Sequence, residues 1–150
     1  MRRAILISVI VSLILLDTYT YLTLRANISS LIIGEIFQIL SFLPYVYAKD
    51  RRLGIFTFSA TLLIVFYASA SQLSWAWILV YAIVADLIAA RKPKLALVQL
   101  SVFFLAQLIA GIPFLPVAVW TVFWGTLFAS LGLLIRNTKD RLEEMQREAE

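Results

Sequence analysis

The sequence contains no cysteine and no histidine, and only 15% of its 150 residues are charged. Without these side chains the chain has no imidazole base, no thiol nucleophile, no disulfide, no haem-ligating histidine and no structural zinc site. An ordinary soluble domain carries about 25% charged residues, so the low charge also argues against a soluble enzyme. These absences favour a protein that has no catalytic activity and needs no cofactor.

Apolar residues fill the composition instead. Hydrophobic residues make up 62% of the chain, and the mean hydropathy is +0.92. Soluble domains are about 45–50% apolar, so folding this chain in water would leave too much apolar surface uncovered. We therefore expect an all-α integral membrane protein. Its isoelectric point near 9.6 is explained by orientation in the membrane, not by nucleic-acid binding.

Charged residues divide the chain into segments of the right length to cross a bilayer. A spanning helix needs about 20 mostly apolar residues. Six segments come close to that length, and they cover residues 4–24, 30–48, 53–70, 73–90, 95–112 and 117–135. The last two meet at a turn that contains Pro113 and Pro116. Residues 1–135 are therefore predicted to form a six-transmembrane-helix bundle.

The basic residues predict how this bundle is oriented in the plasma membrane. Lys and Arg collect in cytoplasmic segments. If the N-terminus is cytoplasmic, 12 of the 13 basic residues fall on the inside, and Arg25 is the exception. Both termini are then cytoplasmic, and residues 136–150 form a charged helical tail. Leu142 and Met145 give this tail a thin apolar edge, which suits either a solvated helix or docking of a cytoplasmic partner.

Each predicted span carries a stripe of small or weakly polar residues at helical spacing. In a membrane, helices associate through close backbone approach and interhelical hydrogen bonds, so such stripes favour helix contacts. Examples are Ser8, Ser12, Tyr19 and Thr23 in the first span, Ala82, Ala85 and Ala89 in the fourth, and Ala118, Thr121, Gly125, Ala129 and Gly132 in the sixth. The aromatic residues Trp75, Trp77, Tyr81, Trp120 and Trp124 lie toward the predicted outer ends, where rings anchor a protein in the headgroup layer.

Three acidic residues lie within the predicted spans. A carboxylate in hydrocarbon costs at least about 2.5–3.5 kcal/mol, so each needs a partner, a cavity or a proton. Asp17 and Glu35 lie at similar depths on neighbouring helices, where with Gln38 they could hold an ion or a proton, or serve structure alone. Asp86 lies near the cytoplasmic end of its span, within reach of Arg91, Lys92 or the basic loop from Lys49 to Arg52, which favours an ion pair.

No motif for an enzyme is present. The chain has no Gly-rich phosphate loop, no paired-Asp protease motif and no Ser/Lys arrangement. A non-catalytic scaffold that binds other membrane proteins and a small transporter both remain open.

The chain also resembles one known family. The similarity comprises Leu43-Pro44 at the end of the second span, Gly54 at the start of the third, the turn from Ser69 to Ser74, the basic loop from Arg91 to Lys94, and a last span that ends in basic residues. In these features the chain looks like MreD, a small subunit of the bacterial rod-shape machinery. The resemblance implies a scaffold for cell-wall elongation that grips a single-span partner of the MreC type.

The alternative is a small membrane transporter. The chain is also similar in size and span number to the substrate-binding subunit of an energy-coupling-factor vitamin transporter, whose partners would be other transporter subunits. A proton- or cation-coupled transporter that works through Asp17 and Glu35 is the third possibility.

Overall fold

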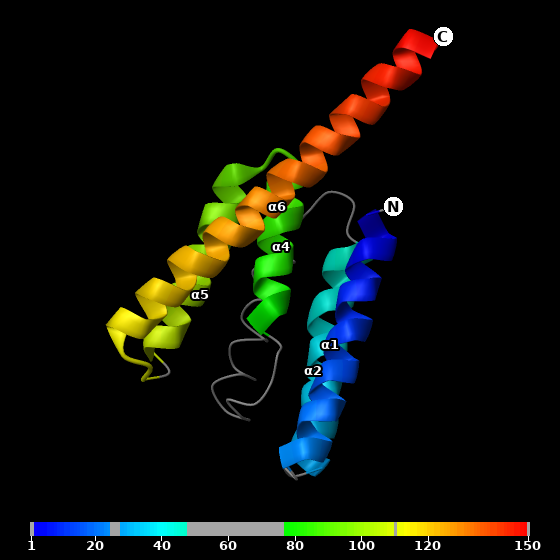
Figure 1. Ribbon diagram of the computed structural model, residues 1–150. Coiled ribbons are helices and arrows are strands. Elements are labelled where there is room, and N and C mark those ends of the chain that lie inside the picture. Colours follow the sequence, from blue (N-terminus) through cyan, green and yellow to red (C-terminus); the bar gives the residue numbers. More distant parts are fainter. Residues whose placement is uncertain (1, 25–27, 48–76, 110, 150) are drawn as a thin grey trace.

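The computed structural model describes residues 2–24, 28–47, 77–109 and 111–149, which form helices and two short turns (Figure 1). The helices are α1 (Arg2–Leu24), α2 (Ile28–Tyr47), α4 (Trp77–Ala89), α5 (Pro93–Ile109) and α6 (Phe114–Ala149). Within these ranges there is no strand, so the predicted all-α class is confirmed. The third predicted span (53–70), Trp75 and the turn from Ser69 to Ser74 lie outside the described residues.

Two of the described helices are long and apolar enough to cross a membrane. They are Arg3–Thr23 in α1 and the 36-residue helix Phe114–Ala149. The described parts of α4 and α5 are also apolar but shorter, with 13 and 17 residues. The structure thus supplies two candidate spans, where the sequence predicted six.

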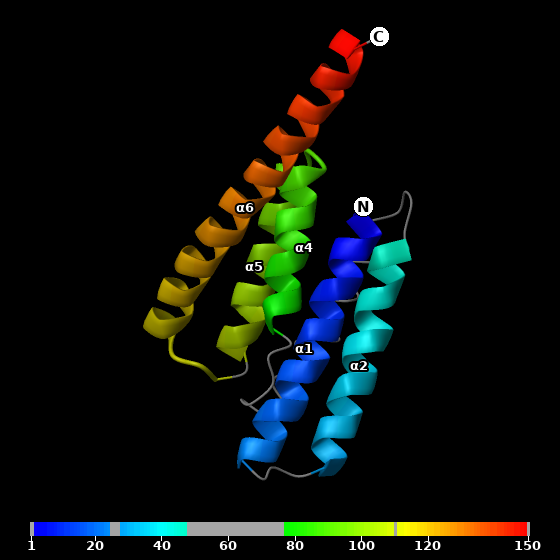
Figure 2. The same cartoon turned by 45° about the vertical axis from the view of Figure 1, so that its right-hand side comes forward.

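The described helices form an antiparallel pair and a three-helix group. Figures 1 and 2 show α1 lying along α2, while α6 lies across α4 and α5. The N-terminus and the α4–α5 turn lie at one end of the molecule, and the α5–α6 turn lies at the other end. The second half of α6 projects past the end that carries the N-terminus. One cation–π contact joins α1 to α2 there, because the Arg3 guanidinium carbon lies 5.3 Å from the centre of the Tyr47 ring.

The core is built around α4. Residues from Leu79 to Ala85, and Leu87, are all buried, so this helix is covered on every side. Its closest neighbour is α6. A Cβ added to Gly132 would lie 2.5 Å from the Ala85 carbonyl oxygen and 2.9 Å from Ile88 Cβ. The predicted use of small residues at helix contacts is therefore confirmed for α4 and α6.

The same prediction does not hold for the contacts of α1 with the other described helices. The side chains that α1 buries are Leu6, Ile10, Leu13 and Asp17, while the predicted stripe of Ser8, Ser12, Tyr19 and Thr23 is exposed. Larger residues at helical spacing, together with Asp17, form the buried face of α1. This face turns toward α2 because the buried Asp17 carboxylate needs a polar partner, which α2 provides. The small-residue stripe of α1 is left uncovered by the described residues.

The turn between α5 and α6 depends on Gly111. Its φ is +91°, in the left-handed region that residues with a Cβ rarely adopt. The Gly111 amide donates to the Leu108 carbonyl at 3.1 Å and the Ile112 amide to the Gln107 carbonyl at 3.2 Å, which closes the end of α5. Helix α6 then begins at Phe114, before the predicted span, so Pro116 lies in its first turn and not in the loop. A proline is tolerated there because an amide in the first turn has no acceptor within the helix.

Candidate functional site

The predicted site residues meet between α1 and α2. Helical spacing places Asp17 on the buried face of α1, one turn beyond Leu13, and Gln38 on the face of α2 that meets it. The Gln38 amide nitrogen donates a hydrogen bond of 2.5 Å to an Asp17 carboxylate oxygen. Asp17 is 6% exposed and Gln38 1% exposed, so this charge-assisted bond is shielded from solvent.

Glu35 completes the acidic cluster, by which we mean Asp17, Glu35 and Gln38. It lies three residues before Gln38 and therefore on the same side of α2. Both of its carboxylate oxygens are buried, and neither has a hydrogen-bond partner among the described residues. The Oε1 atom of Gln38 is likewise buried and has no partner there. The carboxylates of Asp17 and Glu35 also interact electrostatically. The structure thus brings the three predicted residues together, and three of their acceptor oxygens have no hydrogen-bond donor within the described part of the chain.

This arrangement could hold a proton or a small cation. A buried carboxylate is costly unless a donor, a cation or a proton compensates it. The described residues contain no group of three or more metal-ligating His, Cys, Asp or Glu side chains. The chemistry open to the acidic cluster is therefore proton exchange, or binding of a weakly held cation.

A second polar contact joins α2 to α4. The Tyr45 hydroxyl donates a hydrogen bond to the Asp86 carboxylate. This contact was not predicted from the sequence. Of the basic partners predicted for Asp86, Arg91 forms an ion pair with Asp140 on α6, with a guanidinium nitrogen 2.6 Å from a carboxylate oxygen. The predicted partners from Lys49 to Arg52 lie outside the described residues.

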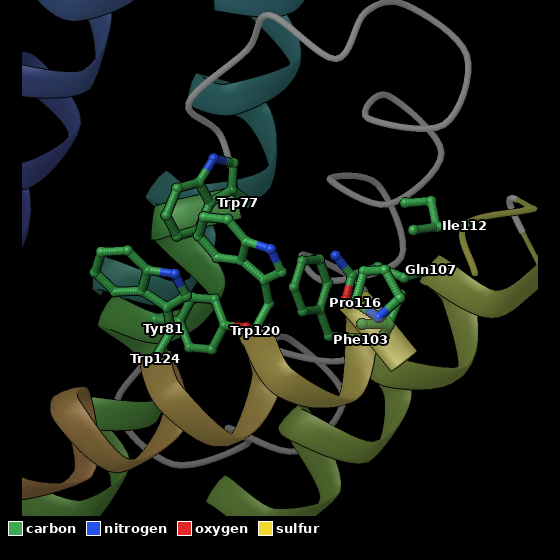
Figure 3. A pocket seen from close by; sticks show the side chains of 9 residues that line it. Trp77, Tyr81, Phe103, Gln107, Ile112, Pro116, Trp120 and Trp124 are labelled. Atoms are coloured by element: carbon green, nitrogen blue, oxygen red, sulfur yellow. The ribbon is translucent and has the colours of Figure 1, made fainter. Parts of the chain in front are cut away.

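Among the predicted interfacial aromatic residues, the structure contradicts the prediction for Tyr81. Tyr81 is 1% exposed, so it is a core residue and not an interfacial anchor; its ring stacks on Phe128 with centroids 5.8 Å apart. Trp77, Trp120 and Trp124 line a cavity of about 180 Å³ between α4, α5 and α6, and their prediction as interfacial anchors stays a prediction (Figure 3). Its lining residues are Trp77, Tyr81, Phe103, Gln107, Ile112, Pro116, Val117, Trp120 and Trp124. Their spacing along separate helices carries no pattern from which the cavity could be predicted.

The exposed stripe of α1 borders an open groove of about 460 Å³. Small residues recur at every fourth position, and the Ser8 and Ser12 hydroxyls donate to the Ala4 and Ser8 carbonyls at 2.7 and 2.8 Å. Because these hydroxyls are satisfied within their own helix, the groove presents no unpaired donor. Its lining residues are Ala4, Ile5, Ser8, Val9, Ser12, Leu13 and Ile78.

The tail is an unbroken continuation of α6. Residues 137–149 are exposed, and Leu142 and Met145 are 49% and 65% exposed. Their role as a docking edge stays a prediction.

No family model, no curated protein and no solved structure matches this chain. Its function must therefore be inferred from the geometry of its own residues.

Proposed function

We propose that the chain is a non-catalytic subunit of a membrane protein complex, whose face on α1 docks a single membrane-spanning helix of another protein. In this proposal the chain forms six spans in the plasma membrane, with both termini in the cytoplasm.

The observation that carries the proposal is the groove along α1. Small residues at every fourth position let a second helix backbone approach closely, which is how helices associate where lipid supplies no hydrophobic driving force. Ala4, Ser8 and Ser12 form such a series, and all three are exposed. The groove has no charged lining residue. Its occupant is therefore an apolar helix at membrane depth.

The outer surface of the described bundle supports placement in a membrane. Large apolar side chains on α6 are more than half exposed, among them Val119, Val122, Phe123 and Leu134. A monomeric soluble protein rarely exposes contiguous apolar surface on this scale, whereas lipid covers it without cost. The similarity to MreD suggests the class of partner, a single-span protein of the MreC type, and a place in cell-wall elongation.

A substitution that fills the groove on α1 with a large side chain tests the proposal. Ser8→Leu places a large side chain where the partner backbone would lie, so we expect co-purification of a single-span membrane protein in mild detergent to fall at least tenfold. Ser130→Leu is the matched control, because Ser130 is an exposed serine on α6 outside the groove. Equal yields of the partner from both variants, or no membrane partner with the unaltered chain, would contradict the proposal.

A second candidate function is a proton- or cation-coupled transporter. It is favoured by the Glu35 carboxylate, whose buried oxygens have no hydrogen-bond partner in the described helices. This candidate requires that Glu35→Gln abolish ion-driven uptake by proteoliposomes, whereas a docking subunit has no such uptake to lose.

A further inference from the structure

The tryptophan cavity between α4, α5 and α6 lies beside the α5–α6 turn, because Gln107, Ile112 and Pro116 are among its lining residues (Figure 3). Trp77, Trp120 and Trp124 gather on one side of it, and Phe103, Gln107 and Pro116 on the other. An apolar cavity of about 150 Å³ in another protein is large enough for benzene. At about 180 Å³, this one has room for a molecule with a single ring.

Two residues that line the cavity carry buried polar atoms, of which one is a hydrogen-bond acceptor and the other a donor. The Gln107 Oε1 atom is an acceptor and the Trp124 Nε1 atom is a donor, and neither has a partner within the described part of the chain. A buried polar atom left unpaired costs about 1–3 kcal/mol. A ligand that presents both a donor and an acceptor would remove both costs, which a hydrocarbon of the same size could not do.

The packing of the tryptophans decides against a cation as the ligand. An aromatic cage for a cation needs ring faces turned toward an open centre. Here the rings pack on one another: centroids lie 5.2 Å apart for Trp77 and Trp124 and 5.9 Å apart for Trp120 and Trp124, with the latter pair stacked at 13°. The cluster therefore offers a wall against which a flat ring can lie, and no lining residue carries a charge.

We propose that this cavity binds a small, planar, uncharged ring compound that bears an amide or similar group with both a hydrogen-bond donor and an acceptor. The ring lies against the tryptophan wall, the ligand donor bonds to Gln107 Oε1, and the ligand acceptor receives the Trp124 indole N–H. This site is separate from the groove on α1 and does not depend on the docking proposal.

Benzamide is the probe, because it is the simplest ring compound with these groups. The 150-residue chain in detergent is dialysed to equilibrium against labelled benzamide, with toluene and benzyltrimethylammonium as competitors. We expect saturable binding of one benzamide per chain, displaced by neither competitor at equal concentration. Absence of saturable binding would overturn the proposal, as would tighter binding of either competitor.

Variants test the two hydrogen bonds separately. Gln107→Leu removes the acceptor, and Trp124→Phe removes the indole N–H while keeping an aromatic ring; each should weaken benzamide binding about five- to tenfold, as expected for one hydrogen bond. Gln99→Leu is the control, because Gln99 is a buried glutamine on the same helix that does not line the cavity. Unchanged affinity in both test variants, or an equal loss in Gln99→Leu, would overturn the assignment.

Discussion

At the scale of single residues, Glu35 and Gln38 on α2 face the same buried region but differ in their hydrogen bonding. Gln38 gives its amide to Asp17, whereas both oxygens of Glu35 lack a partner in the described structure. The sequence identified all three residues because polar groups in an apolar segment stand out. It did not reveal which pair forms the hydrogen bond, because that depends on the rotation of each helix.

This difference predicts stability changes of opposite sign. Gln38→Leu should lower the free energy of unfolding by about 1.5–3 kcal/mol, because Asp17 loses a hydrogen bond to a charged group. Glu35→Leu should raise it by about 1 kcal/mol, because it removes buried acceptors that have no donor among the residues the structure describes. The midpoint of thermal unfolding in detergent measures both changes. A fall in both variants would show that Glu35 has a stabilising role.

At the scale of helices, the close approach of α4 and α6 depends on one missing side chain. Gly132 lies so near α4 that an added Cβ would overlap the Ala85 carbonyl oxygen, whereas at Gly125 it would meet Leu100 Cδ1 at an ordinary 3.5 Å. Both glycines belong to the predicted stripe of α6. Their different environments could not be predicted from spacing, because one lies against backbone and the other against a movable side chain.

Substituting each glycine by alanine should separate these environments. Gly132→Ala should destabilise the protein by about 1–3 kcal/mol, the usual cost of overpacking. Gly125→Ala should stabilise it by up to about 1 kcal/mol, because alanine is the better helix former and its methyl group fits. Thermal unfolding of the two variants side by side is the measurement, and equal shifts would contradict the close approach.

At the scale of the whole molecule, basic residues gather toward one end of the described bundle. The start of α1, the α4–α5 turn and the projecting half of α6 lie toward one end, and they contain Arg3, Arg91, Lys92, Lys94 and the basic residues of the tail (Figures 1 and 2). The α5–α6 turn at the opposite end has no charged residue. This polarity supports the proposed orientation, in which the basic end faces the cytoplasm.

The absence of cysteine makes the orientation directly measurable. Single variants Ser29→Cys, Lys94→Cys and Thr138→Cys place one thiol at the start of α2, beside the α4–α5 turn and in the tail. A membrane-impermeant maleimide should label position 29 in intact cells, and positions 94 and 138 only after lysis. Labelling of position 94 or 138 from outside would reject the proposed topology.

Several features of this protein were determined by the sequence alone, because they depend on composition along the chain. The apolar content and the spacing of charges predicted helices close to those described: α1 and α2 lie within two residues of their predicted limits, and the tail continues α6. The acidic residues within apolar segments were predictable for the same reason, since a charge in an apolar run needs no structure to be noticed.

Which face of each helix meets which neighbour was decided only by the tertiary structure. In so apolar a chain, most helix faces look alike, so periodicity gives little contrast between a face that meets lipid and one that meets protein. The structure therefore placed Tyr81 in the core, left the serine stripe of α1 open and assembled the tryptophan cavity from three helices. Helix rotation is set by steric fit and by the pairing of buried polar groups such as Asp17 and Gln38, and neither is visible until the helices are packed together.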